Sequence, residues 1–262
     1  MVFLKILEKL YMKKKVAIII EARSSSKRLP GKILLPLGKK TVLEFLIQRL
    51  KIVSKKINSK IIIATTTSKD DKKIVDLAKK NLVNFYQGSE NNVLKRVIEA
   101  AKKHKIEVVI RITSDCPLID IDIVKQMFET FKNNNVDLVT NAHVRTYPDG
   151  MDVEVMSTSS LKKALLLAKR NKELLEHVTL SMKKYNKKFR IINCVSPEET
   201  NYPKIGLTLD EINDYKLIKN IVAFFKKKNQ KKFNCIDLVN LLKKNKNFLK
   251  INQKVKRTKY SV

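Results

Sequence analysis

The sequence predicts a three-layer α/β/α protein of Rossmann-like type, in which helices cover both faces of a mostly parallel sheet. Short β-branched runs alternate with helical stretches of about ten to fifteen residues, and this alternation favours right-handed βαβ units. Clusters of Ser, Thr, Asp and Gly follow several of these runs. They mark the carboxyl edge of the sheet, where proteins of this class bind ligands. The length of 262 residues suits one large domain with a sizeable core.

The alternation of strand and helix is regular up to about residue 140. Helices are expected from Thr41, whose hydroxyl can cap the first one, to about residue 53, from about residue 70, from about 91 to 103, and over 121–131. Strands are expected at residues 16–20, 60–64, 83–86, 107–112 and 136–140.

Beyond residue 141 the order of elements changes. Strands are expected at 151–156, 189–194 and 205–209, and helices at about 157–170 and 173–184. We expect residues 141–209 to form a lid or substrate subregion on the same sheet, within a main domain of residues 15–225. The remainder is an N-terminal extension, residues 1–14, and a basic C-terminal extension, residues 226–262. From about residue 213 the chain is expected to form two Lys-rich helices, followed by a tail that is disordered from about residue 250.

The composition excludes several classes of protein. Hydrophobic residues make up 44% of the chain, which is typical of a folded protein. No apolar run approaches the roughly 20 residues that span a bilayer, so no membrane span is expected. Cys116, Cys194 and Cys235 are widely separated and odd in number, which argues against a disulfide framework. We therefore expect a reduced, cytoplasmic protein.

The formal net charge of +31 favours nucleic acid or an anionic membrane surface as a partner. The lysines are, however, scattered through every segment, and Trp is absent. Few aromatic side chains are interleaved with the basic runs, so platforms on which bases could stack are scarce. We expect most of this charge to be solvated surface, with no specific nucleic-acid partner. A basic nucleic-acid-binding protein stays open as an alternative.

The first strand leads into a basic loop, residues 21–32, with the sequence Glu-Ala-Arg-Ser-Ser-Ser-Lys-Arg-Leu-Pro-Gly-Lys. Its cations, hydroxyls and backbone N–H groups together can hold a polyphosphate. Arg23 and Arg28 stand out in a chain that otherwise uses Lys, because the planar guanidinium matches phosphate oxygens in a bidentate manner. No Walker pattern is present, and a solvated basic loop remains the alternative.

The motif Ala22-Arg23-x-x-Ser26-x-Arg28-Leu29-Pro30-Gly31-Lys32 resembles the signature loop of the cytidylyltransferases that activate sugars, above all the spore-coat polysaccharide type. It is more distantly similar to CMP-Kdo and CMP-N-acetylneuraminate synthetases, which have the nucleotide-diphospho-sugar transferase fold. The resemblance covers about residues 15–225. Ser25 and Ser114 stand where the family commonly has Gly.

The resemblance implies a set of residues that bind CTP and Mg²⁺. The loop residues that would hold CTP are Ala22, Arg23, Ser24, Ser26, Arg28 and Lys32. Asp115, at the end of the strand 107–112, can hold Mg²⁺ against a triphosphate, and Asp210 would complete the metal site. Both aspartates could instead cap a turn or a helix. From their positions at strand ends, Thr65, Ser89 and Asn92 are candidates for contacts with the base and ribose.

Acidic residues of the subregion are candidates for binding the acceptor. Asp152 and Glu154 have the alternate spacing of one strand face, and Asp149 precedes them in a turn. In the family resembled, this segment lies where the sugar binds, although a solvated strand face is the alternative. Arg111 and Lys32 could offset developing charge, and His177 lies in a Glu-His-Val-Thr sequence that is similar to the family's.

The resemblance therefore implies a nucleotidyltransferase that transfers CMP from CTP to an acidic or amino sugar and releases pyrophosphate, for surface polysaccharide synthesis. Transfer of this kind depends on positioning and charge neutralisation. A homodimer is a further expectation from the family. The same fold using another nucleotide, such as GTP, with a sugar-1-phosphate acceptor is the first alternative.

Overall fold

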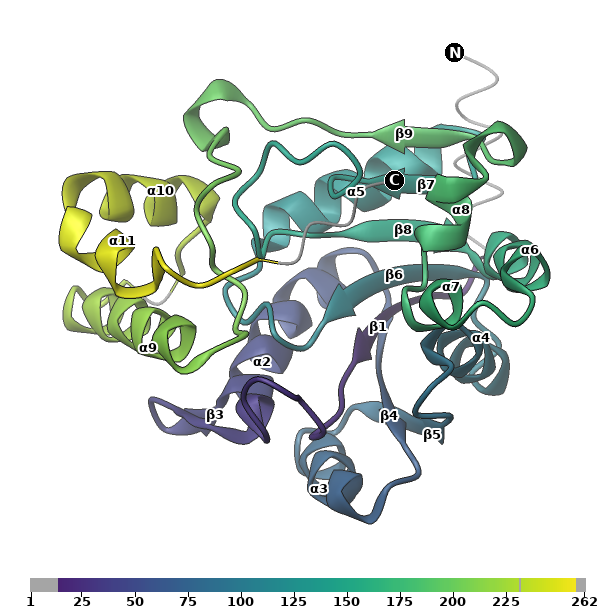
Figure 1. Ribbon diagram of the computed structural model, residues 1–262, viewed down its shortest axis with the longest axis horizontal. Helices are drawn as coiled ribbons and strands as arrows, with labels where there is room; N and C mark the ends of the chain where they lie inside the picture. Colours follow the sequence, from purple (N-terminus) through teal and green to yellow (C-terminus); the bar gives the residue numbers. More distant parts are fainter. Residues whose placement is uncertain (1–13, 231, 258–262) are drawn as a thin grey trace.

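The computed structural model describes residues 14–230 and 232–257 and has a seven-stranded sheet at its centre (Figure 1). The strand order is β5-β4-β1-β6-β8-β7-β9. Strand β8 pairs antiparallel with both of its neighbours, and the other pairings in this sheet are parallel. The strands are β1 (Val16–Glu21), β4 (Lys60–Thr66), β5 (Asn84–Gly88), β6 (Val108–Thr113), β7 (Leu138–Thr140), β8 (Glu154–Ser157) and β9 (Ile191–Asn193). The predicted fold class is confirmed.

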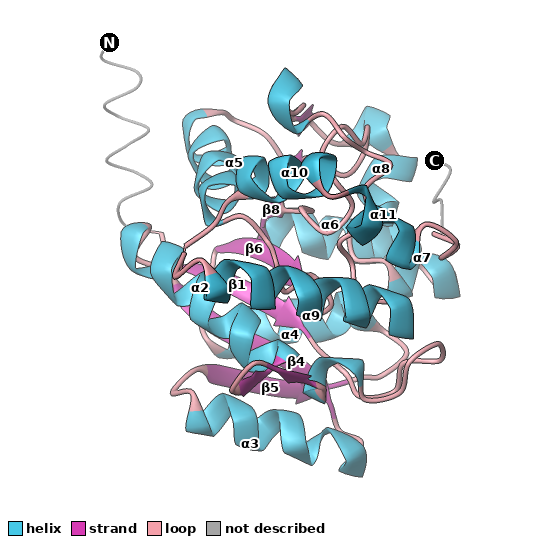
Figure 2. Ribbon diagram, turned by 90° about the vertical axis from the view of Figure 1, so that its left-hand side faces the viewer, coloured by secondary structure: helices cyan, strands magenta, loops and turns pink. Residues whose placement is uncertain are grey.

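Helices cover both faces of the sheet, because the buried strands alternate their side chains between two cores. Ile18 and Ile20 of β1 belong to one core, with α2 (Val42–Lys56), α3 (Lys72–Lys80) and α5 (Ile121–Asn133). Ala17 and Ile19 belong to the other, with α4 (Val93–Lys103) and α6 (Thr158–Ala168). Figure 2 shows α2 and α9 in front of the strands. Thr41 caps α2 as predicted, since its hydroxyl accepts the N–H of Glu44 at 3.2 Å.

Several short elements complete the described chain. A hairpin of β2 (Pro36–Leu37) and β3 (Lys40–Thr41) precedes α2 and was not anticipated from the sequence. The single-turn helices are η1 (Lys32–Leu34), η2 (Lys69–Asp71), η3 (Asn186–Lys188) and η4 (Glu198–Thr200).

The structure corrects three expectations for residues 141–209. Strand β8 begins at Glu154 rather than at 151, and the expected helix 173–184 is two helices, α7 (Lys172–Glu176) and α8 (Leu180–Lys184). The break follows because the Thr179 hydroxyl, at the start of α8, donates to Glu154 Oε1 at 2.7 Å. No strand forms over 205–209. There the chain makes only an isolated bridge between Asp149 and Gly206. The N–H of Asp149 donates to the carbonyl of Ile205, and the carbonyl of Asp149 accepts the N–H of Leu207.

From about residue 213 onward the described chain has three helices rather than two. They are α9 (Ile212–Lys227), α10 (Cys235–Lys244) and α11 (Lys246–Asn252), and α11 packs on α9. The expectation of a disordered tail from residue 250 is wrong for residues 250–257, because residues 250–252 belong to α11 and Arg257 donates to Thr208 and Asp214. Residues 1–13 of the predicted N-terminal extension and residues 258–262 of the tail lie outside the described residues.

Across the described residues, no helix is long and apolar enough to cross a membrane.

Candidate active site

Asp71 fastens the basic loop to the neighbouring strand. The backbone N–H and the hydroxyl of Ser24 both donate to Asp71 Oδ1, at 2.8 and 2.6 Å. The other carboxylate oxygen accepts from the hydroxyls of Thr65 and Thr66, at 3.0 and 2.5 Å. Burial raises the pKa of Asp71, but these hydrogen bonds outweigh burial and hold the pKa below its usual value. Asp71 therefore fixes where the loop leaves β1, a role that no local sequence signal announced.

The remainder of the loop folds back on itself. Gly31 has φ of +67°, a left-handed conformation that favours glycine, and its N–H donates to the carbonyl of Ser24 at 3.0 Å. The hydroxyl of Ser26 accepts the N–H three residues further on, at 3.4 Å. Ser25 does not have a positive φ, and its hydroxyl donates to Glu90 at 2.7 Å. Serine is thus accommodated where the family resembled commonly has glycine.

Four residues predicted to contact the nucleotide have internal roles in this structure. Ala22 is buried at the end of β1, and Thr65 is fully buried with its hydroxyl turned to Asp71. The side chain of Asn92 accepts an N–H of the first turn of α4 at 2.8 Å and so caps that helix. The hydroxyl of Ser89 accepts the N–H of Asn92 at 3.1 Å. Their contacts with base or ribose stay predictions.

Sequence reasoning missed Arg96, which projects from α4 toward the basic loop. Its side chain is 1% exposed, and Nη1 donates to the carbonyls of Ser89 and Glu90 at 2.5 and 3.4 Å. Its Nε is buried without a hydrogen-bond partner. Burial lowers the pKa of Arg96, and the charge of Arg23 lowers it further, whereas Glu21 raises it. The available signal was again an arginine in a chain that otherwise uses lysine.

Lys32 joins the two aspartates that were predicted to hold a metal ion. Its Nζ lies 2.8 Å from Asp115 Oδ2 and 3.2 Å from Asp210 Oδ1. Burial lowers the pKa of Lys32, but the two carboxylates outweigh burial and hold the pKa above its usual value. The backbone also brings these segments together, because the N–H of Leu209 donates to the carbonyl of Asp115 at 2.8 Å. Two residues that are 95 positions apart in the sequence, 115 and 210, thus share one cation.

The two arginines of the basic loop contact different acids. Arg28 lies 2.9 Å from Asp210 Oδ1 and 3.7 Å from Glu211 Oε1. Arg23 lies 3.2 Å from Glu176 Oε1 at the end of α7, and both of these side chains are more than a third exposed. Exposed pairs of this kind contribute about 0 to 1 kcal/mol, so a ligand can replace them at little cost.

The donor set at Asp115 and Asp210 fits Mg²⁺. Mg²⁺ prefers oxygen ligands, keeps several waters, and is commonly bound by one or two carboxylates together with substrate phosphates. The ammonium of Lys32 shows that one cation can contact both carboxylates at once. Within residues 14–230 and 232–257, no group of three or more His, Cys, Asp or Glu side chains could hold a metal ion by itself. The triphosphate would therefore have to supply further ligands.

The predicted acceptor acids Asp149 and Asp152 flank Arg145. Arg145 makes a bidentate pair with Asp152, at 2.6 Å for each hydrogen bond, and lies 3.2 Å from Asp149. Asp149 also accepts the hydroxyl of Thr208 at 2.9 Å. Burial raises the pKa of Asp152, with Asp149 and Glu154 adding to the effect, and Arg145 only partly opposes it. Both acids are about a quarter exposed, so an acceptor could reach them.

Glu154 lies in a different environment, a buried ion cluster formed by Glu21, Arg111, Glu154 and Lys183. Its carboxylate is 2% exposed and lies 2.7 Å from Arg111 and 2.8 Å from Lys183. Arg111 also pairs in a bidentate manner with Glu21, at 2.6 and 2.9 Å. Burial raises the pKa of Glu154, but the two cations outweigh burial and hold it well below its usual value. Neither Arg111, predicted to be catalytic, nor Glu154, predicted to bind the acceptor, faces the open part of the site.

His177, predicted to contact the substrate, lies between α7 and α8 and is partly buried. Burial lowers its pKa, and Arg111 lowers it further, while Glu176 opposes the shift. The imidazole is therefore neutral at pH 7, next to the buried ion cluster. Its role in binding substrate stays a prediction.

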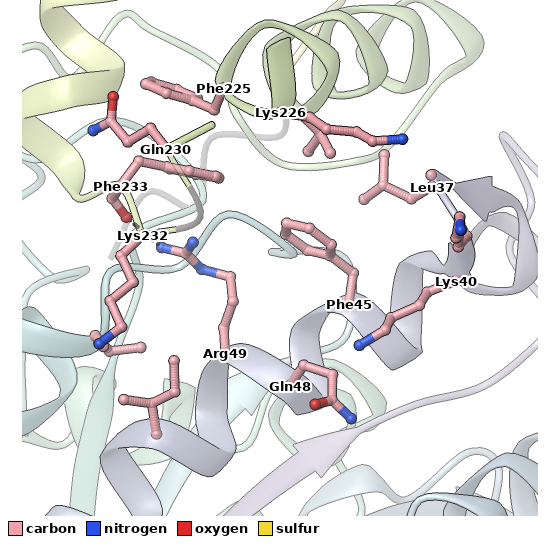
Figure 3. Close-up of a pocket in the computed structure, with 15 residues that line it drawn as sticks. Leu37, Lys40, Phe45, Gln48, Arg49, Phe225, Lys226, Gln230, Lys232 and Phe233 are labelled. Carbon is pink, nitrogen blue, oxygen red and sulfur yellow. Dashed lines mark hydrogen bonds between the residues drawn. The ribbon is translucent and has the colours of Figure 1, made fainter. Parts of the chain in front are cut away.

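A cavity of about 370 Å³ lies away from these residues, between α2 and α9. Figure 3 shows Phe45 and Arg49 of α2 opposite Phe225 of α9. Arg49 lies 4.4 Å from the centre of the Phe233 ring and donates to the Phe233 carbonyl at 2.8 Å. The residues that line this cavity include none of the predicted site residues.

Comparison with known proteins tests which family this site belongs to. A sequence model of the cytidylyltransferase family matches residues 17–255. The chain belongs to this family. It is a nucleotidyltransferase, and the predicted resemblance to the spore-coat type and to CMP-Kdo synthetases is confirmed, the latter by a 3-deoxy-manno-octulosonate cytidylyltransferase of Photobacterium profundum that is 28% identical over 47% of this chain.

Three relatives illustrate the range of the family. A cytidylyltransferase structure from Leptospira borgpetersenii has 36% sequence identity and a TM-score of 0.84, covering 95% of this chain and 100% of that chain. The spore coat polysaccharide biosynthesis protein SpsF of Bacillus subtilis is 28% identical, covering 88% of this chain and 95% of its own. The structure of a CMP-2-keto-3-deoxy-manno-octonic acid synthetase complexed with CTP has 15% identity and a TM-score of 0.56, covering 82% and 100%. At that identity, the last comparison supports the fold alone.

Proposed function

We propose that this cytidylyltransferase acts in the cytoplasm, where it transfers CMP from CTP to a hydroxyl of an acidic or amino sugar and releases pyrophosphate. The activated sugar then serves the synthesis of surface polysaccharide. The observation that carries the proposal is the ammonium group of Lys32, the last residue of the basic loop, which Asp115 and Asp210 share. That arrangement supports a cation site next to a site for polyphosphate. Its relatives include a polysaccharide biosynthesis protein, which supports the proposed pathway class.

The reaction requires charge neutralisation and alignment. The acceptor hydroxyl gives up its proton to solvent as its oxygen attacks the α-phosphorus of CTP in line, a new P–O bond forms, and the bond to the pyrophosphate leaving group breaks. Arg23 and Arg28 bind the triphosphate, and Lys32 moves from the two aspartates to the phosphate oxygens. Mg²⁺, when held by Asp115 and Asp210, supplies Lewis-acid stabilisation of the phosphoryl oxygens. The cations of the basic loop therefore exchange acidic protein partners for acidic substrate partners.

The acceptor is proposed to bind at Asp149 and Asp152 rather than at Glu154. We expect Asp149 to accept a hydrogen bond from a sugar hydroxyl, because its side chain is partly exposed. Arg145, which pairs with both aspartates, could contact an anionic group of the sugar. Glu154 already accepts from four side chains, so we assign it no contact with the acceptor.

Thermal unfolding with each of CTP, GTP, UTP and ATP, with and without Mg²⁺, tests the nucleotide and the metal. We expect CTP with Mg²⁺ to raise the midpoint, since a ligand at about 100 times its dissociation constant adds roughly 2.7 kcal/mol. Asp115→Asn should lose most of this rise. A larger rise with GTP would favour the sugar-1-phosphate alternative. No rise with any nucleotide, together with salt-dependent binding of DNA, would favour the nucleic-acid-binding alternative.

Pyrophosphate release with CTP and a panel of acidic, amino and neutral sugars tests the acceptor. We expect turnover with an acidic or amino sugar and none with a neutral hexose. Light scattering at micromolar concentration tests the proposed homodimer, and a monomer mass would contradict it.

A further inference from the structure

Arg257, from the segment after α11, reaches the site from the far end of the chain. In Figure 1 the yellow segment that follows α11 runs back toward the end of β6. The guanidinium of Arg257 lies between three aspartates: Nη2 donates to Asp214 Oδ1 at 2.6 Å, while Nη1 and Nε lie 3.8 Å from Asp210 and Asp149. Nη1 also donates to the carbonyl of Thr208 at 3.1 Å. This arginine therefore stands between the proposed metal ligand and the proposed acceptor acid.

Asp214 links Arg257 to the backbone of the metal site. Its side chain is fully buried, and its Oδ2 accepts the N–H groups of Asp210 and Glu211 at 3.0 and 2.9 Å. Its Oδ1 accepts from Arg257 and from Asn252 at 2.6 and 2.8 Å. A buried carboxylate that loses a charged partner is strongly destabilised. The orientation of Asp210 thus depends on a carboxylate whose counter-charge comes from residue 257.

Gly206 supplies independent support that the position of Arg257 is built into the fold. Its φ is outside the left-handed region, so the backbone does not require glycine there. A Cβ at Gly206 would, however, lie 2.1 Å from Arg257 Nη2. The absent side chain makes room for the guanidinium. Its carbonyl accepts from Asn252 Nδ2 at 2.9 Å, and Arg28 of the basic loop donates to the carbonyl of Lys256 at 3.2 Å.

We propose that Arg257 is a positioning residue of the cytidylyltransferase reaction, which holds Asp210 and Asp149 in register so that metal and acceptor meet at the α-phosphorus. The inference rests on the proposed function and extends it to a residue two positions beyond the span that the family model matches, 17–255. The alternative role is a cation that competes with the metal for Asp210. The distances favour positioning, because the short contacts of Arg257 go to Asp214 and Thr208, and Asp210 lies 3.8 Å away.

Mn²⁺ binding, followed by electron paramagnetic resonance at saturating CTP without acceptor, separates these roles. Loss of a partner behind a metal ligand typically costs about 10-fold to 100-fold in affinity, so Arg257→Ala should weaken Mn²⁺ binding about 10-fold. Arg257→Lys should recover little, because an ammonium cannot span the same contacts. Lys256→Ala is the matched control: it removes an exposed charge one position away and should leave the affinity within about twofold.

Gly206→Ala tests the same geometry without altering any charge. It should displace the guanidinium and weaken Mn²⁺ binding, and the double variant Gly206→Ala/Arg257→Ala should be no weaker than Arg257→Ala alone. In turnover assays Arg257→Ala should raise the KM for the sugar and leave the KM for CTP within about twofold.

Each of the following results would overturn the proposal. Tighter Mn²⁺ binding by Arg257→Ala would show a competing cation, and unchanged binding with a lower melting temperature would show only a structural clamp. If the wild-type protein bound no Mn²⁺ with CTP, the proposed function would fail together with the inference. If the wild-type protein bound Mn²⁺ and the variants bound it equally well, the inference alone would be overturned.

Discussion

Two clusters of charged side chains lie near the carboxyl ends of β1 and β6, and they differ in how their charges are paired. In the buried ion cluster, the cations and acids contact one another directly, and the side chains of Glu21, Arg111, Glu154 and Lys183 are at most 17% exposed. In the open cluster, formed by Arg28, Lys32, Asp115 and Asp210, exposure reaches 39%, and one oxygen of Asp210 receives both cations.

The difference indicates which charges are available to a substrate. In the buried ion cluster, each contact compensates a desolvated charge, and removing one partner leaves another unpaired. In the open cluster, Arg28 and Lys32 share acids that a metal ion could take over, and the freed cations can then bind phosphate. Burial therefore separates the carboxylates predicted from the sequence into Glu154, which pairs with buried cations, and Asp115 and Asp210, which stay partly exposed.

The largest expected effect is loss of turnover in Asp115→Asn. The variant keeps the shape of the side chain but removes a proposed metal ligand, which should lower kcat/KM on the order of 10³-fold, because metal stabilisation contributes several kcal/mol to the transition state. Steady-state pyrophosphate release measures this. The melting temperature should stay close to that of the wild type, since Asp115 is about a quarter exposed. A variant with a lowered melting temperature that keeps its turnover at temperatures where it is folded would contradict the comparison.

The reverse pattern is expected for Glu154→Gln in the buried ion cluster. Loss of the charge leaves Arg111 and Lys183 under-compensated in a desolvated site, at a cost of about 3 to 5 kcal/mol. The melting temperature should fall by roughly 10 °C, as measured by circular dichroism. Correctly folded molecules at low temperature should retain most of the turnover. If Glu154→Gln lost turnover without losing stability, Glu154 would belong with the acceptor acids, as the sequence predicted.

Local patterns were sufficient to predict the first half of the fold and the basic loop. The β-branched runs that become β1, β4 and β6 are buried on both faces, so their hydrophobicity identifies them without knowledge of their neighbours. Asp115 and Asp210 were found because each follows such a run or a matching motif. The position of β8 between β6 and β7 was not predictable in the same way, because sheet order depends on contacts between distant segments.

The missed contacts are also long-range. Arg111 and Glu154 are 43 positions apart, and Arg257 and Asp214 are likewise 43 apart, so no local spacing indicates that either pair forms. One signal was available for Arg257: it is an arginine in a lysine-rich tail, as Arg23 and Arg28 are in the basic loop. An isolated arginine among lysines therefore marked a site residue in the loop, and the same pattern in the tail was not used in the prediction.

A pH titration of stability sharpens the comparison further. The folded pKa of Glu154 is held well below its ordinary value of about 4.5 by Arg111 of β6 and Lys183 of α8, with Glu21 of β1 nearby. As pH falls below that ordinary value, the unfolded chain binds a proton first, so the contribution of Glu154 declines with falling pH. Urea unfolding at pH 7 and at pH 3.5 should show the difference in unfolding free energy between the wild type and Glu154→Gln narrowing by about 1.4 kcal/mol at the lower pH, with the remainder lost only as pH falls through the folded pKa. A constant difference between them would contradict this assignment.

The smallest effect is expected at Arg23, whose pairing with Glu176 is exposed. Arg23→Gln should change the free energy of unfolding by less than about 0.5 kcal/mol, because exposed ion pairs contribute little. It should nevertheless raise the KM for CTP about tenfold, which corresponds to about 1.4 kcal/mol, since one charge-assisted contact with the triphosphate is lost. Lys27→Gln removes an exposed charge from the same loop and is the matched control, with an expected KM within about twofold. Equal effects of the two substitutions on the KM for CTP would mean that Arg23 and Lys27 attract CTP by net charge alone. Specific binding of the triphosphate would then depend on Lys32 and the two aspartates of the open cluster.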